Sequence, residues 1–174
     1  MDKEKLSHQL FSNVTRTYMV LDGAVVPNLP MRLFEMRPQH YCLFTGDLEP
    51  DMQEVAPYLV RLLPKTPFTE WVLDECWGNQ WGVFAQSRYS IQDMRTHFRS
   101  LVNVYDEKAV SMIFRFYDSQ VMRKFLPTCN AGEVKMFFGK VDTYFAELED
   151  DKSLKQLFHR KHLRVTENVS AYLE

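Results

Sequence analysis

The sequence predicts an α/β protein, a single domain with a central mixed β-sheet flanked by helices and a short C-terminal helical appendage. Its length of 174 residues suits one compact domain with a small addition. Hydrophobic residues make up 45% and aromatic residues 14% of the chain, enough for a core that needs no metal or disulfide. Strand-like runs alternate with segments of helical spacing, and this alternation favours a sheet covered by crossover helices.

The first half of the chain shows this alternation. Leu6, Leu10, Phe11 and Val14 recur at near-helical spacing and predict a helix within residues 1–16. After it, β-branched and aromatic runs that close in turn residues predict strands, and apolar residues on one helical face beside a proline predict helices. These segments are, in order, a strand at 17–23, a helix at 27–37, strands at 40–47 and 55–64, and a helix at 67–80.

The second half continues the pattern. Ser90 with Asp93 three residues later is a variant of the capping box, and Asp118 is placed to cap the helix that follows it. The segment 133–148 fits a helix followed by a strand as well as one bent strand. The other predicted elements are a strand at 81–87, a helix at 90–101, a strand at 111–118 and a helix at 119–126. The predicted divisions are an N-terminal helix at 1–16, an α/β domain at 17–140 and a short C-terminal helical segment at 141–174.

The run 111–118 is the clearest strand, and Arg115 lies in it on the face opposite the phenylalanines. A buried guanidinium without a partner is too costly, so Arg115 needs an acidic partner, and Asp22 and Asp118 are the candidates. A structural ion pair, or a cation–π contact beside Tyr117, is favoured over direct binding of a ligand.

Composition and charge narrow the classes of partner. Lys and Arg total 21 against 23 Asp and Glu, so no basic field attracts nucleic acid. No uncharged run approaches the length of a membrane span and the N-terminus lacks an apolar signal core, so we expect a cytoplasmic protein without membrane contact. Cys42, Cys76 and Cys129 lack the close spacing of metal or redox motifs and are expected to be free thiols of a reducing compartment.

The sequence carries no P-loop, GxGxxG, GxSxG or HExxH motif. We therefore expect no enzyme activity and no cofactor. His159 and His162 are three residues apart, but the basic residues around them would repel a cation, so no metal site is expected. The alternative is a small hydrolase or transferase with a site built from Asp22, His97 and Arg115, although a hydrogen-bonded structural role suits His97 better.

The run "FRFYD", followed by a short helix and "LP", resembles the signature of the type VI secretion effector chaperone (adaptor) family, long catalogued only as a domain of unknown function. The segments "YMVLDGA", "LPMRLFE", "CLFTGD", "APYLVRL", "WGVFAQS", "MRTHFRSLVNV" and "MFFG" follow the family's order. Ser119 and Gln120 depart from the family's common Pro-Arg, and only 35 residues follow "MFFG", where many relatives have a longer lobe. The residues that match the family pattern include Asp22, Gly23, Pro57, Trp81, Phe114, Arg115, Phe116, Tyr117, Asp118, Pro127 and Gly139.

The resemblance implies a non-catalytic cytoplasmic adaptor that binds a secreted toxic effector and helps load it onto the valine-glycine repeat spike protein. Aromatic and methionine side chains suit an apolar groove for such a client, and Tyr58, Trp81 and Tyr117 are the predicted partner contacts. A third possibility is an immunity protein that inhibits a neighbouring toxin, suggested by the acidic segment 47–54.

Overall fold

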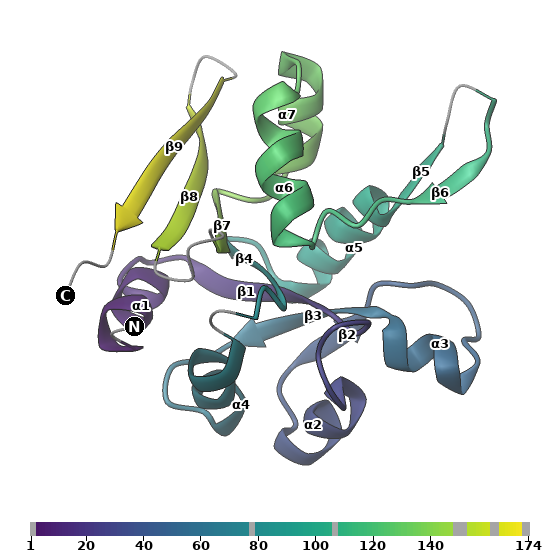
Figure 1. Cartoon of the computed structure of the whole chain (residues 1–174), viewed down its shortest axis with the longest axis vertical. Helices are drawn as coiled ribbons and strands as arrows, with labels where there is room; N and C mark the ends of the chain where they lie inside the picture. Colours follow the sequence, from purple (N-terminus) through teal and green to yellow (C-terminus); the bar gives the residue numbers. More distant parts are fainter. Residues whose placement is uncertain (1–2, 77–78, 106–107, 148–152, 161–163, 172–174) are drawn as a thin grey trace.

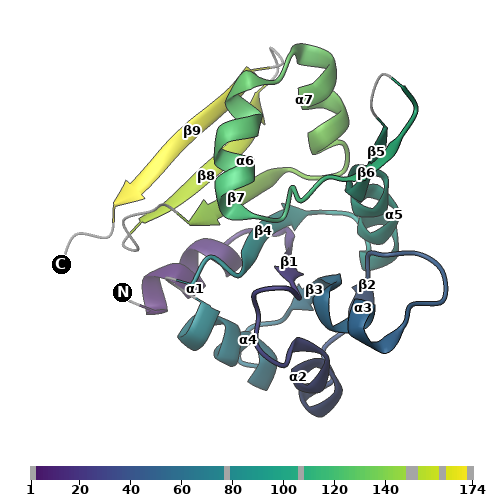
Figure 2. The same ribbon diagram turned by 45° about the vertical axis from the view of Figure 1, so that its right-hand side comes forward.

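The computed structural model describes residues 3–76, 79–105, 108–147, 153–160 and 164–171. One large β-sheet forms the middle layer, and helices cover both of its faces (Figure 1). The turned view separates the upper group of helices from the lower group on either side of the sheet (Figure 2). The α/β class and the single domain predicted from the sequence are confirmed.

The large sheet consists of seven strands. They are β1 (Arg16–Asp22), β2 (His40–Cys42), β3 (Pro57–Leu62), β4 (Gly82–Ser87), β7 (Thr143–Glu147), β8 (Ser153–Arg160) and β9 (Arg164–Ala171). Their order is β2-β3-β1-β4-β7-β8-β9, and every pairing among them is antiparallel, whereas the sequence predicted a mixed sheet. Composition and the alternation of strand-like and helical segments do not report strand direction, because strands that are covered on both faces are apolar whether their neighbours are parallel or antiparallel.

Helices from both halves of the chain surround the sheet. They are α1 (Lys3–Phe11), α2 (Leu29–Met36), α3 (Pro50–Val55), α4 (Pro67–Trp71) with a π-helical turn (Val72–Cys76), α5 (Ile91–Val102), α6 (Ser119–Phe125) with a 3-10 turn (Leu126–Thr128), and α7 (Ala131–Phe138). α5, α6 and α7 pack on one face of the sheet, and α1, α2 and α4 pack on the other. Within the described ranges, no helix is long and apolar enough to cross a membrane.

The central strands bury side chains on both faces. Along β1, Tyr18 and Val20 enter the core beneath α5, whereas Met19 and Leu21 enter the core beneath α2 and α4. A strand that is covered on both faces has an uninterrupted apolar sequence, which accounts for the run "YMVL". The sequence therefore located this strand correctly by composition.

The predicted strand at 111–118 is largely wrong. Only Ser111–Ile113 is extended, as β6, and it pairs with β5 (Asn103–Tyr105) in a separate hairpin that projects from the body (Figure 1). The residues that follow form a tight turn. In it, the N–H of Phe116 donates to the carbonyl of Phe114 over 2.9 Å. Phe116 and its neighbour Tyr117 are both buried, so the period-two alternation expected of a strand does not hold.

The helical assignment predicted for 141–174 is also wrong. After α7, which resolves the ambiguous segment 133–148 as a helix followed by a strand, the chain continues as β7, β8 and β9. The apolar spacing in this tail fits a helix when it is considered alone. β8 pairs with the outer edge of β7 along the whole length of β7, however, and this pairing overrides the local preference.

Candidate functional site

One end of the sheet gathers three segments that are far apart in the sequence. In the antiparallel register Asp22 pairs with Pro57, and its neighbour Leu21 pairs with Gly82. The N–H of Asp22 donates to the carbonyl of Trp81 over 2.9 Å. The segments "LDG", "APY" and "WG" therefore meet at this place, which we call the Asp22 end.

Two glycines allow backbones to approach closely at the Asp22 end. A Cβ atom at Gly82 would lie 2.0 Å from the carbonyl oxygen of Val20. A Cβ atom at Gly23 would lie 2.4 Å from the carbonyl oxygen of Ala56, which accepts from the N–H of Gly23 over 3.2 Å. Any side chain at these positions would overlap the neighbouring backbone, so both require glycine.

The loop 114–118 closes the Asp22 end through an ion pair. The guanidinium of Arg115 donates to the carboxylate of Asp22; the Asp22 side chain is 3% exposed and the Arg115 side chain 47%. The other carboxylate oxygen accepts from the N–H of Ala24 over 3.0 Å. The hydrogen bond to Asp22 raises the pKa of Arg115 above its ordinary value. Of the two acidic residues named as candidates, Asp22 is therefore the one that pairs with Arg115.

Asp118 and Ser119 fix the other side of the loop. The Oδ1 atom of Asp118 accepts from the N–H of Gln120 over 2.8 Å and caps α6, as the sequence predicts. The hydroxyl of Ser119 donates to the carbonyl of Gly82 over 2.8 Å. A proline at position 119, which the family resemblance leads one to expect, could not make this contact. The serine thus supplies a second attachment of the loop to the sheet.

The other residues of the family-like pattern serve packing. Phe116 stacks on Phe98 with ring centroids 5.5 Å apart, and Phe114 meets Phe125 edge-on at 4.8 Å. Pro127 lies in the 3-10 turn that ends the α6 segment. These aromatic contacts hold α5, α6 and the loop together as one unit, so Phe114 and Phe116 have a structural role.

Burial and the same ion pair shift the pKa of the Tyr117 hydroxyl. Burial, and then the negative charge of Asp22, raise the pKa of Tyr117 to about 12 from its ordinary value of 10.0, while Arg115 partly opposes the rise. Below pH 10 the tyrosine is neutral in both states. Between pH 10 and pH 12 the unfolded chain loses the proton first, so the free energy of unfolding falls as the pH rises.

We predict that Tyr117→Phe makes the alkaline loss of stability shallower than in the wild type. Two pKa units correspond to about 2.7 kcal/mol, which is an upper value for this residue. Urea unfolding at intervals between pH 9 and pH 12 measures the difference, because the other buried tyrosines titrate alike in both proteins. Parallel curves for the two proteins would contradict this account of Tyr117.

His97 makes contacts with α7. Its Nε2 atom is 3.1 Å from the carbonyl oxygen of Phe137, and burial lowers the pKa of His97 below its ordinary value. Gly139 ends α7 with a φ of 43°, and a Cβ atom there would lie 2.5 Å from the His97 ring. The histidine and the glycine therefore pack as a matched pair, which is the structural role that the sequence favoured for His97.

The hydrolase or transferase site considered from the sequence is not assembled. The hydroxyl of Ser87 donates to the carbonyl of Lys140, so the region of His97 borders the Ser87 end of β4. Asp22 borders the opposite, Gly82 end of the same strand. Six residues of strand separate these ends by about 16 Å. His97 therefore cannot act together with the ion pair of Asp22.

The three side chains predicted to contact a partner are all buried. Tyr58 is 8% exposed, Trp81 9% and Tyr117 2%. Trp81 packs on Trp71 with ring centroids 5.4 Å apart, and the Tyr58 hydroxyl donates to the carbonyl of Gln53 over 2.9 Å. Such side chains offer a partner little area, so contact area has to come from exposed apolar residues near them.

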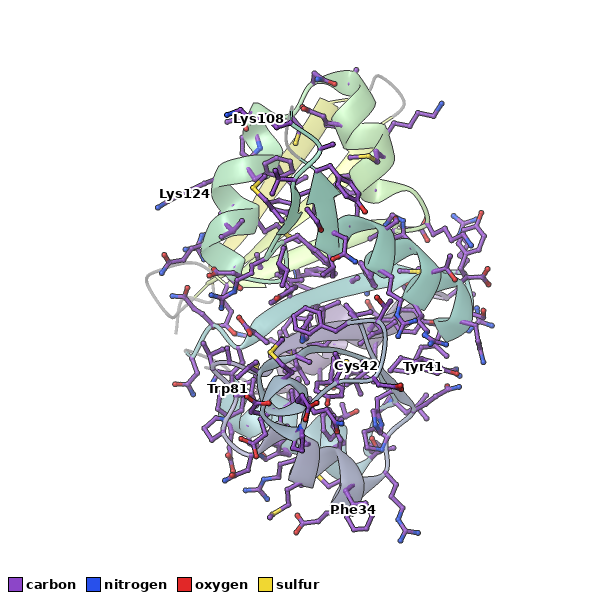
Figure 3. All side chains as sticks on the ribbon, turned by 90° about the vertical axis from the view of Figure 1, so that its right-hand side faces the viewer. Phe34, Tyr41, Cys42, Trp81, Lys108 and Lys124 are labelled. Carbon is purple, nitrogen blue, oxygen red and sulfur yellow. The ribbon has the colours of Figure 1, made fainter. Side chains whose placement is uncertain are left out.

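Exposed apolar residues gather beside the Asp22 end. Two of them, Phe34 and Met31, are 76% and 60% exposed, and Phe34 extends away from the body at the foot of Figure 3. Met31 lines a hollow of about 450 Å³ between the loop 23–28, the start of α2 and the end of α3. A second hollow of about 310 Å³ shares Val25 with it and reaches Asp22. We call the exposed residues of this region the apolar face: Val25, Met31, Phe34, Met52 and Val55.

Only a weak signal for the apolar face is present in the sequence. Of the apolar residues in the predicted helix 27–37, Leu29 and Leu33 are buried, whereas Phe34 is exposed. Met31 and Phe34, three residues apart, form a separate apolar stripe on the solvent side of α2. An apolar content in "LPMRLF" too high for a single buried stripe was the available clue.

The described residues contain no group of three or more His, Cys, Asp or Glu side chains placed to hold a metal ion. His159 and His162 lie outside the part of the chain whose side chains are described. Burial raises the pKa of each thiol, that of Cys129 to about 11, and all three cysteines are free. Thiols with raised pKa values are poor nucleophiles at neutral pH, so these cysteines serve packing.

Fold and site together define an α/β protein with helices on both faces of one antiparallel sheet and an ion-paired loop across one sheet end. The chain belongs to the family described as Domain of unknown function (DUF4123), whose model matches residues 17–135. Comparisons with curated proteins and with solved structures give no match.

Proposed function

We propose that this protein is a non-catalytic adaptor of type VI secretion. It binds a toxic effector in the cytoplasm and helps load it onto the valine-glycine repeat spike protein. Membership in the DUF4123 family supports the proposal, because the segments that match the family pattern resemble those of effector adaptors. The residues at the Asp22 end are engaged in holding the fold, which leaves recognition to the surface beside them.

The observation that carries the proposal is the apolar face. Five side chains of two neighbouring helices and a loop remain exposed although both cores of the protein are already filled. Phe34 and Met31 are the most exposed of them, and aromatic and methionine side chains adapt well to varied protein surfaces. The hollow that Met31, Val25 and Val55 line is open to a side chain of the partner.

Asp22 holds the loop that leads to this surface, through its backbone carbonyl and its carboxylate. Gly23, which follows Asp22, begins the loop that leads to α2, and Val25 of the loop lines both hollows. The N–H groups of Val25 and Val26 donate to the carbonyl of Asp22. The loop therefore keeps its shape as long as Asp22 is held, and the apolar face is a preorganised one.

The test is co-purification of the tagged chain with the effector and spike proteins encoded by its gene neighbours. We expect Phe34→Asp to weaken capture of at least one of them by more than about tenfold, because a charge replaces an aromatic contact. The free energy of unfolding should stay within about 0.5 kcal/mol of the wild type, since the ring is exposed.

Met136→Asp is the matched control, since Met136 is 61% exposed and lies on α7, across the sheet. It should leave capture unchanged. Failure of the well-folded wild type to capture either neighbour, or equal loss in both variants, would remove the apolar face from the proposal.

A further inference from the structure

Three arginines lie together on the sheet face opposite the apolar face, along the β2 edge. Arg95 and Arg99 are one turn apart on α5, and Arg61 is on β3. The guanidinium of Arg95 lies over the ring of Tyr41 at 4.7 Å. Tyr41, which is labelled in Figure 3, belongs to β2, the last strand on this side of the sheet. We call Arg61, Arg95 and Arg99 the arginine edge.

The sheet register brings Arg61 to the same place. Tyr41 pairs with Leu59, and Arg61 is two residues further along β3, so Arg61 and Tyr41 point to the same face as diagonal neighbours. Arg95 covers Tyr41 from above, from α5. The two guanidinium groups therefore approach one surface from the sheet and from the helix.

None of the ion pairs formed by the described residues involves these three arginines. The Nε atom of each of them is buried and has no hydrogen-bond partner within that part of the chain. The acidic residue nearest in sequence, Asp93, is occupied by the Lys140 ammonium at 2.8 Å and by the Ser90 hydroxyl. The guanidinium groups of Arg61 and Arg95 thus have no acidic ion-pair partner among the described residues, so they favour an anionic group from outside.

Arg99 differs from Arg61 and Arg95, because its guanidinium is hydrogen-bonded to the backbone. Its Nη2 atom donates to the carbonyl oxygens of Cys42 and Phe44 over 2.9 and 3.0 Å, at the free edge of β2. It also lines a hollow of about 370 Å³ with Phe44, Asp47 and Tyr58. Arg99 thus holds the edge strand in shape, and Arg61 and Arg95 are left for binding.

We propose that the arginine edge binds an extended acidic segment of a partner protein. Alternate side chains of an extended chain point to the same side, about 6.7 Å apart. A segment that lies along β2 with carboxylates at every second position therefore presents them to the face on which Arg61 and Arg95 lie. The free edge of β2 runs beside this segment, and an extended chain can pair with such an edge.

A peptide carboxylate fits this surface better than nucleic acid. The formal net charge of the whole chain is −2, so no wide basic field surrounds the three arginines. A guanidinium pairs with a carboxylate through two parallel hydrogen bonds, which suits isolated arginines. The inference stands apart from the proposed function, because it concerns the opposite face and does not depend on the apolar face.

The test is fluorescence anisotropy with the full chain and a labelled octapeptide of alternating Glu and Val. We expect binding that weakens with added salt, and about tenfold weaker binding for Arg61→Gln and for Arg95→Gln. Arg32→Gln is the matched control, because its guanidinium also lies over an aromatic ring, that of Trp71 at 5.6 Å, on the other face. It should bind like the wild type, as should Phe34→Asp.

Three results would overturn the inference: no binding of the octapeptide to the wild type, unchanged binding in the double variant of Arg61 and Arg95, or tighter binding of an eight-nucleotide single-stranded DNA. Thermal melting of each variant establishes that it is folded. Since Phe34→Asp tests the apolar face alone, a failure here is distinguishable from a failure of the proposed adaptor function.

Discussion

Gly82→Ala is expected to leave little folded protein, with a loss in the free energy of unfolding of about 4 kcal/mol or more. The added methyl carbon would lie 2.0 Å from the carbonyl oxygen of Val20 and 3.0 Å from its carbonyl carbon. Both atoms belong to the backbone of β1, which cannot rotate aside as a side chain can. β1 and β4 would have to separate at the centre of the sheet, where both faces are covered by core.

Gly132→Ala serves as the control. Gly132 lies in the first turn of α7, and a Cβ atom there meets only the side-chain oxygen of Asn130 at 3.3 Å. We expect a change within about 1 kcal/mol, because alanine favours the helix while the capping side chain adjusts slightly. Soluble yield and urea unfolding of both variants make the comparison. A Gly82→Ala protein as stable as the control would contradict the close approach of β1 and β4.

Arg115→Ala is expected to lower the free energy of unfolding by about 3 kcal/mol, because it leaves a buried carboxylate without its cation. The Asp22 side chain is 3% exposed and, among the described residues, would retain only the N–H of Ala24 as a hydrogen-bond donor. Half of the arginine side chain faces solvent, so water reaches part of the site and the loss falls at the lower end for a buried pair. Capture of a partner should fall only in proportion to the unfolded fraction.

A second variant separates charge from shape. In the double variant Arg115→Ala with Asp22→Asn, a neutral amide replaces the stranded carboxylate, and we expect recovery of at least about 1 kcal/mol. Arg88→Ala is the control, since its contact with Asp142 is 3.8 Å long and its side chain is 83% exposed. It should cost less than about 0.5 kcal/mol. A fully stable Arg115→Ala protein that fails to capture its partner would show that Arg115 acts in recognition instead.

Prediction from the sequence succeeded where the signal is local. Ser90 caps α5 by accepting from the N–H of Asp93, and Asp118 caps α6, as their positions indicated. It failed for 111–118, where the aromatic run looked like a strand. Phe116 and Tyr117 are buried by packing of a loop between helices, and the composition of a run does not distinguish that burial from burial in a sheet.

The candidate site divides in the same way. The sequence singled out Asp22, Gly23 and Arg115 and required an acidic partner for the arginine. It named Tyr58 and Trp81 as contact residues, although both are buried, and it did not single out Phe34, which is exposed. An aromatic side chain has the same identity in the core and at the surface, so its sequence position alone does not reveal which one it occupies.

The sequence by itself determined the α/β class and the caps of α5 and α6, because each follows from hydrophobic content or from the few residues around it. Only the tertiary structure decided the antiparallel register, the strands of the C-terminal segment and the two surfaces that are left exposed. These depend on which segment pairs with which edge and on which apolar side chains the core has room for. Strand pairing and core packing both depend on contacts between residues far apart in the chain, and a local sequence pattern does not predict such contacts.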